Sequence, residues 1–179
     1  MQKIEEDTKA EFENIILDLT SNSVVQQMKV YKQHYDTSCY EHCFNVAYYS
    51  YLICKKFNLD YKSVARSGML HDLFLYDWRT RIEDRKGLHA FTHPRTALDN
   101  AKELFELSEK EEDIILKHMW PVTIKFPKYK ESYIVTIVDK FCAIQESYKY
   151  YRKASGTQKI LRYASFAINI MILNSFNIW

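Results

Sequence analysis

The sequence predicts an all-α protein that folds as a single domain. Its 179 residues are a length typical of one domain with a substantial core. It contains only three glycines and three prolines, so it has few of the residues that the tight turns of sheet proteins need. Hydrophobic residues make up 47% of the chain and recur at helical spacing, which indicates roughly six to eight short helices in one bundle.

Four helical stretches are expected in the N-terminal half. In the first, Phe12 and Ile16 fall on one face of a helix. Ser38 and Glu41 form a capping box, which places the start of another helix at Cys39. The expected stretches cover residues 5–19, 24–31, 39–57 and 61–73.

The C-terminal half begins with a charged segment, residues 76–91, that shows little periodicity and is expected to be a loop. Pro94 is expected at the first position of the next helix, where its missing N–H costs nothing, and that helix continues to Leu104. Ser108 and Glu111 form a second capping box, which predicts the start of a helix that is expected to end before Pro121. Two further helices are expected, over residues 133–148 and 158–174.

Composition and charge exclude several classes of protein. The net charge of +2 argues against a stable nucleic-acid binder, which would show a strong basic excess. The first nine residues are polar and carry three acids, so no signal peptide is expected. Residues 164–179 are apolar but short for a membrane span, so we expect a helix that packs on the core or forms a homodimer contact. Four cysteines without a Cys-x-x-Cys pair are typical of a reducing cytoplasm.

Several histidines lie on the apolar faces of these predicted helices, among them His42, His71 and His118. A single inward histidine is more often a satisfied core residue than a ligand. However, Asp72 and Asp139 also fall inside apolar runs, where an unpaired carboxylate would be costly. Imidazoles and carboxylates that point into the same core indicate a metal site.

The order of these residues resembles the HD-domain metallohydrolase superfamily. The resemblance covers about residues 35–145 and is carried by the segments YEHCFNVA, GMLHDLFLYDW, FTHP, ILKHMWP and TIVDKF. It implies that residues 1–179 form a single HD-type helical bundle, in which the N- and C-terminal helices pack on this core region.

The resemblance also implies a centre with two divalent metal ions, in which the residue matching Asp72 bridges both. The implied ligands are His42, His71, Asp72 and Asp139 for the first ion, and Asp72, His93 and His118 for the second. Mixed nitrogen and oxygen donors suit Fe or Mn best, and Mg, Ni, Co or Zn are also suitable.

The expected function is that of a metal-dependent phosphohydrolase, with His71 and Asp72 in the catalytic centre. A metal-activated hydroxide would cleave a phosphoester or phosphoanhydride of a small phosphorylated substrate, such as a nucleotide. Two alternatives remain open. The resemblance also extends to HD-type mixed-valent di-iron oxygenases, and a non-catalytic nucleotide-binding regulator would need the pocket but no activated water.

Substrate contacts are expected outside the ligand set. His34 and His89 are candidates to protonate the leaving group, and Arg79, Arg81, Lys86 and Arg95 are candidates for an anion-binding rim. Many phosphohydrolases of the superfamily place Glu or Lys three residues after the aspartate, where this chain has Leu75. Asp77, Trp78 and Arg79 follow closely and are candidates to take over that role.

Overall fold

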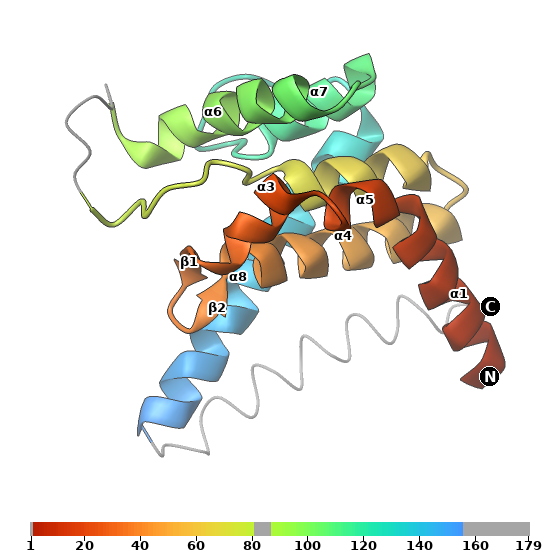
Figure 1. Cartoon of the computed structure of the whole chain (residues 1–179), viewed down its shortest axis with the longest axis horizontal. Coiled ribbons are helices and arrows are strands. Elements are labelled where there is room, and N and C mark those ends of the chain that lie inside the picture. The colour runs from red at the N-terminus through yellow and green to blue at the C-terminus, as the bar shows by residue number, and fades with distance from the viewer. Residues whose placement is uncertain (1, 81–86, 156–179) are drawn as a thin grey trace.

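The computed structural model describes residues 2–80 and 87–155 (Figure 1). Within these residues the chain forms eight α-helices, one short 3-10 helix and one two-stranded hairpin, which confirms the all-α class. The helices are α1 (Gln2–Ile15), α2 (Leu17–Thr20), α3 (Ser23–Gln26), η1 (Gln27–Lys29), α4 (Cys39–Lys56), α5 (Tyr61–Leu70), α6 (His89–Leu104), α7 (Glu109–Lys117) and α8 (Lys130–Ser155). The antiparallel strands are β1 (Lys32–His34) and β2 (Thr37–Ser38).

Helices α4 and α5 pack closely at the centre of the molecule, with α6 and α7 on one side of them (Figure 1). The close packing depends on Gly68 in α5. A Cβ atom at Gly68 would lie 2.8 Å from the Cα atom of Ala47 in α4, so any other residue would push the two helices apart. This contact also sets the position of the residues that immediately follow α5.

Buried hydrophobic residues form two clusters, and α4 and α5 contribute residues to both. The larger cluster lies mainly against α1 and α6 and includes Phe12, Ile16 and Tyr51. The smaller cluster, which includes Val46 and Ile114, lies against α7 and α8. All four cysteines are free and buried, as expected for small apolar core residues.

Both predicted capping boxes are present and set the first residues of α4 and α7. The Ser38 hydroxyl oxygen accepts from the N–H of Glu41, and the Glu41 carboxylate accepts from the N–H of Ser38. Ser108 and Glu111 make the same pair of bonds. Helix α8 is longer than expected at both ends, since it covers Lys130–Ser155. The helix expected over residues 158–174 lies outside the described residues.

Two further predicted boundaries are wrong, at the start of α6 and at the end of the second helical stretch. Helix α6 begins at His89, so Pro94 lies inside the helix rather than at its first position. The early start follows from tertiary packing, because the His89 ring stacks on Trp78 at 5.5 Å and lies edge-on to Phe74 at 4.9 Å, both between ring centroids. The second helical stretch is also shorter than expected, because α3 and η1 give way to strand β1 at Lys32.

The small β1–β2 hairpin was not predicted. Its turn includes Tyr35, which has a φ of 52°, and its register is irregular between Lys32 and His34. The Trp78 indole N–H donates to the backbone carbonyl of Gln33 at 3.2 Å, which ties the hairpin to the segment after α5. Irregular pairing of this kind re-aims side chains, and here Gln33 reaches Asp72 while His34 lies beside His42.

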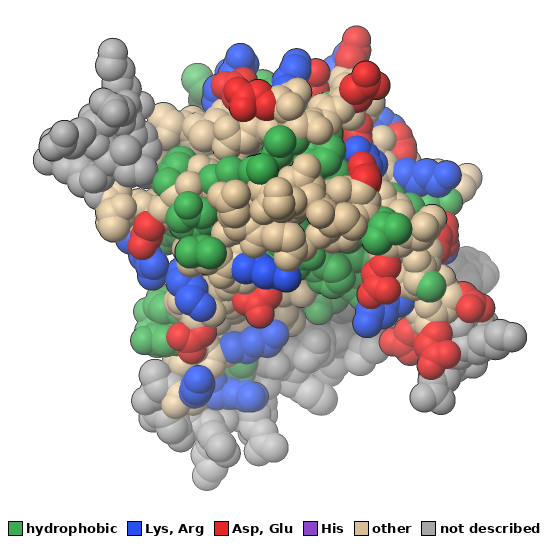
Figure 2. All heavy atoms as spheres, in the orientation of Figure 1, with side chains coloured by type: hydrophobic (Ala, Val, Ile, Leu, Met, Phe, Trp, Pro, Cys, Tyr) green, Lys and Arg blue, Asp and Glu red, His purple; other side chains and the backbone are tan. Residues whose placement is uncertain are grey.

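The surface carries charges of both signs. Figure 2 shows Lys and Arg side chains interspersed with Asp and Glu over the face it presents, with hydrophobic side chains between them. The described part of the chain contains no candidate membrane-spanning helix.

Candidate metal centre

The six predicted ligands converge in the interior from five segments of the chain. All are buried, with exposed fractions between 0 and 8%. Helix α4 contributes one ligand, the end of α5 contributes two adjacent ones, and α6, the end of α7 and α8 contribute one each. In this order the residues are His42, His71 and Asp72, His93, His118 and Asp139.

The first group of ligands contains His42, His71 and Asp72, whose ligand atoms all lie within 4.8 Å of one another. Asp139 borders the same group. Its Oδ1 atom is 3.0 Å from His42 Nε2 and 3.7 Å from His71 Nε2. Two imidazole nitrogens and two carboxylates therefore face one small volume.

The second group contains Asp72, His93 and His118, whose ligand atoms also lie within 4.8 Å of one another. The Asp72 Oδ1 atom is 3.2 Å from His93 Nε2 and 3.5 Å from His118 Nε2. The other oxygen, Oδ2, lies 3.5 Å from His71 Nε2 in the first group. Asp72 thus offers one carboxylate oxygen to each group, which is the arrangement that a bridging ligand requires.

Hydrogen bonds on the far side of three rings determine which nitrogen faces the centre. The Nδ1 atoms of His71, His93 and His118 each donate at 2.8 Å to a backbone carbonyl, those of Gly68, His89 and Ile115 respectively. Because a carbonyl only accepts, each Nδ1 carries the proton, and in a neutral ring Nε2 then has a free lone pair. All three lone pairs point into the centre, as metal-ligating histidines require.

Unsatisfied atoms within the centre fit a bound cation. His71 Nε2 and Asp72 Oδ1 are buried and make no hydrogen bond. His93 Nε2 and His118 Nε2 face each other at 2.9 Å, although in the neutral rings both are acceptors. Buried acceptors without donors are costly unless a cation satisfies them. The donor set of four imidazoles and two carboxylates therefore fits divalent metal ions.

The pKa values reflect the same crowding of charge. Burial alone would raise the pKa of Asp72 and of Asp139, but the surrounding histidines hold both pKa values well below their usual range. Burial lowers the pKa of His118 to about 3. Burial also acts to lower the pKa of His42, but its hydrogen bonds to Asp139 and Glu146 raise it well above the ordinary value. The carboxylates are thus held ionised, ready to act as ligands.

Two residues at the centre were not predicted. Gln33 in β1 donates from its Nε2 atom to Asp72 Oδ2 at 2.5 Å. Glu146 accepts from His42 Nδ1 at 3.0 Å. No local signal marks Gln33, but Glu146 follows Asp139 by two helical turns, and this spacing on one predicted helix is a signal that could have found it.

The predicted substrate contacts are divided between the centre and the surface. His34 lies beside His42, with ring centroids 5.1 Å apart, and His89 stacks on His93 at 4.4 Å. Arg79 and Arg95 instead form exposed ion pairs with Asp77 and Asp99. Arg81 and Lys86 lie outside the described residues.

The segment after Asp72 differs from the pattern expected of many phosphohydrolases. Leu75 has a φ of 49° and packs against the larger hydrophobic cluster, so it brings no charge to the centre. The nearby Asp77 carboxylate accepts a hydrogen bond from Arg79, whose Nε atom lies 2.9 Å from Asp77 Oδ1.

The buried histidines and aspartates that successive helices bring together form a candidate metal centre in a helical domain. The family model of the HD domain matches residues 39–144, a span that contains all six predicted ligands. The chain therefore belongs to the HD-domain family, whose members are typically metal-dependent hydrolases. Comparisons with curated proteins and with solved structures found no match.

Proposed function

We propose that this protein is a metal-dependent phosphohydrolase that acts on a small phosphorylated molecule, such as a nucleotide. The observation that carries the proposal is the position of Asp72, which presents one oxygen to each of two groups of buried ligands. In this proposal His42, His71, Asp72 and Asp139 hold one divalent ion, and Asp72, His93 and His118 hold the second. Fe or Mn suits these nitrogen and oxygen donors best.

The two ligand groups would hold divalent cations, whose chemistry would be to lower the pKa of bound water and to polarise a phosphoryl group. The protein itself supplies a rigid frame for this chemistry. His71, His93 and His118 are each held by a backbone carbonyl, so little reorganisation is needed when ligands bind.

The charge of the centre favours an anionic substrate. Asp72, Asp139 and Glu146 are the buried carboxylates next to the histidines, and they do not fully neutralise two divalent cations. Lys140 adds a further positive charge, because its Nζ atom lies 3.2 Å from Asp139 Oδ2. His34 and His89 border the centre, and we propose that one of them protonates the leaving group.

The test is an activity screen of the full chain, reconstituted with Mn²⁺ or with Fe²⁺ under argon. We expect metal-dependent release of phosphate from at least one phosphoester or nucleotide, and no release by the Asp72→Ala variant. Turnover by the Mn²⁺-loaded protein should be the same with and without O₂, because hydrolysis needs no oxidant. Protein that holds two ions yet hydrolyses no phosphorylated compound, or that consumes O₂ with each turnover, would contradict the proposal and favour a regulator or an oxygenase.

A further inference from the structure

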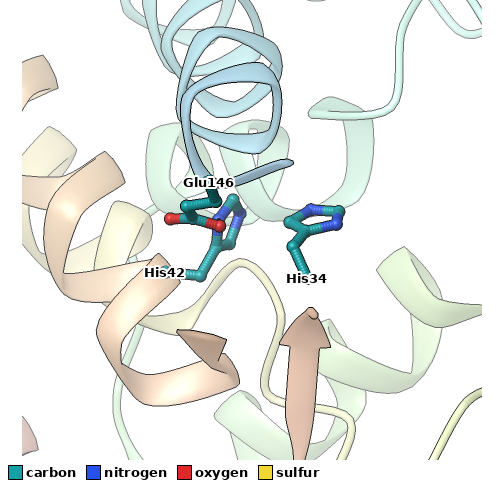
Figure 3. A group of neighbouring side chains, drawn as sticks. All are labelled: His34, His42 and Glu146. Carbon is teal, nitrogen blue, oxygen red and sulfur yellow. The ribbon is translucent and has the colours of Figure 1, made fainter. Parts of the chain in front are cut away.

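Glu146 places a third carboxylate directly behind the candidate centre. It lies on α8, is only 5% exposed, and its Oε2 atom is 3.0 Å from His42 Nδ1. Figure 3 shows its carboxylate against the His42 ring, with His34 approaching from the end of β1. The contact spans 104 residues of sequence, so α4 and α8 must be packed correctly for it to form.

This contact distinguishes His42 from the other three histidines. Their Nδ1 atoms donate to neutral backbone carbonyls, whereas His42 Nδ1 faces a carboxylate. Both ring nitrogens of His42 face a carboxylate at 3.0 Å, Nδ1 facing Glu146 and Nε2 facing Asp139, so without a cation the ring can donate to both. A cation held on the Nε2 side, next to the first ligand group, would leave the remaining proton on Nδ1, where Glu146 accepts it. A carboxylate behind an imidazole fixes its orientation and makes it a stronger metal ligand.

We propose that Glu146 is a positioning residue that makes the two ion positions unequal. The position near His42 and Asp139 would bind its cation more tightly, because Glu146 makes His42 a stronger metal ligand and adds a negative charge nearby. Within residues 2–80 and 87–155, Asp72 is the one carboxylate that contacts His93 and His118, so a cation at that position would bind more weakly. This inference rests on the two-ion centre proposed above.

A different role for Glu146 is to hold an ion itself. His34, His42 and Glu146 also have ligand atoms within 4.8 Å of one another. An ion on His42 Nδ1 would, however, move the ring proton to Nε2 and remove His42 from the first group. The geometry favours the positioning role, because the first group offers His71, Asp72 and the bordering Asp139, all buried. The alternative site offers only Glu146 and the half-buried His34 beside His42.

The test is a Mn²⁺ titration of the metal-free full chain, with free Mn²⁺ followed by electron paramagnetic resonance. The wild type should bind one ion tightly and a second more weakly. In Glu146→Gln, which keeps an acceptor for Nδ1–H but removes the charge, the tight dissociation constant should rise about 10- to 100-fold while the weaker one stays unchanged. Glu131→Gln is the matched control, since Glu131 is also a buried carboxylate on α8, but it pairs with Lys110.

The outcomes separate this inference from the proposed centre. An unchanged tight step in Glu146→Gln, or a change in the weaker step alone, overturns the inference and leaves the two-ion centre intact. His34→Ala should retain both ions at wild-type affinity, and loss of an ion in this variant would show that Glu146 and His34 are ligands themselves. A wild type that binds only one ion contradicts both the two-ion centre and the proposed difference in affinity between the two positions. Even then, the effect of Glu146→Gln on the affinity for that ion shows whether Glu146 supports the site.

A measurement on the unmodified chain avoids any folding defect in the variants. Long-range ¹H–¹⁵N spectra of the Zn²⁺-loaded protein report which nitrogen of each histidine carries the proton. We expect His42 to be protonated at Nδ1 and metal-bound at Nε2. Metal bound at Nδ1 would overturn the positioning role.

Discussion

Each histidine of the candidate centre is oriented through its Nδ1 atom. For His71, His93 and His118 the acceptor is a carbonyl three or four residues earlier in the same helical segment. The direction of these Nε2 atoms is thus set locally, by the helix that carries each ring. His42 depends instead on Glu146, a residue of another helix.

At this scale the decisive substitution is Asp72→Ala. Because Asp72 has an oxygen at each group of ligands, the variant should lose both ions while its helicity stays close to that of the wild type. Metal content and far-ultraviolet circular dichroism measure the two effects. Asp77→Ala, which removes an exposed acid five residues later, is the control. Wild-type metal content in Asp72→Ala would show that another residue bridges the ions.

At the scale of elements, two close contacts between helices keep the ligand residues in position. Gly68 allows α5 to approach α4, and α5 ends immediately before His71 and Asp72. Asp113 ties α7 to the start of α8, because it accepts from the Lys128 backbone N–H at 2.9 Å and from the Ser132 hydroxyl at 2.7 Å. These two helices carry the ligands that come last in the sequence.

Gly68→Ala should destabilise the protein by about 1–3 kcal/mol, because the added Cβ overlaps the backbone of Ala47. The same shift of α5 should weaken metal binding. Chemical denaturation and Mn²⁺ titration measure the two effects, and Lys62→Ala, an exposed change on the same helix, is the control. A variant as stable as the wild type would show that the helices adjust without cost.

Asp113→Asn should change how stability depends on pH. Burial acts to raise the pKa of Asp113, but its bonds to Lys117, Lys128 and Ser132 outweigh this and lower it. Because its pKa is lowered in the folded state, ionised Asp113 stabilises the fold at pH values above its unfolded-state pKa of roughly 4. This stabilisation is lost as the pH falls through the folded-state pKa. The variant should therefore lose about 1–3 kcal/mol at pH 7 and progressively less in acid. Urea denaturation at several pH values tests this, and an equal loss at every pH would contradict it.

At the scale of the whole molecule, the ligands come from five segments between His42 and Asp139. An unfolded chain cannot bring them together, so metal ions would bind the folded state alone. Bound ions should therefore link α4, α5, α6, α7 and α8 and stabilise their packing.

Divalent metal should accordingly raise the melting temperature. Saturation at a hundred times the dissociation constant stabilises a fold by about 2.7 kcal/mol per site, and chelation should reverse the effect. Calorimetry of the full chain with Mn²⁺ and then with excess chelator measures this. Asp72→Ala should show no shift with metal, and an equal shift in that variant would place the binding elsewhere.

The sequence by itself determined the helical class, the first residues of α4 and α7, and the six candidate ligands in their order. Capping boxes act within four residues and can be read locally, as Ser38 with Glu41 and Ser108 with Glu111 show. The ligand positions were recognisable because a whole set of residues resembles a known family. Their roles in holding two ions remain a proposal that the metal titrations test.

Only the tertiary structure decided the early start of α6, the small hairpin and the surroundings of the ligands. His89 begins α6 because it packs on Trp78 and Phe74, and a local reading of Pro94 could not include that contact. Gln33 meets Asp72 across 39 residues of sequence, and Glu146 meets His42 across 104. Such contacts depend on how helices pack, because no short-range pattern encodes the partner of a side chain that lies on a distant element.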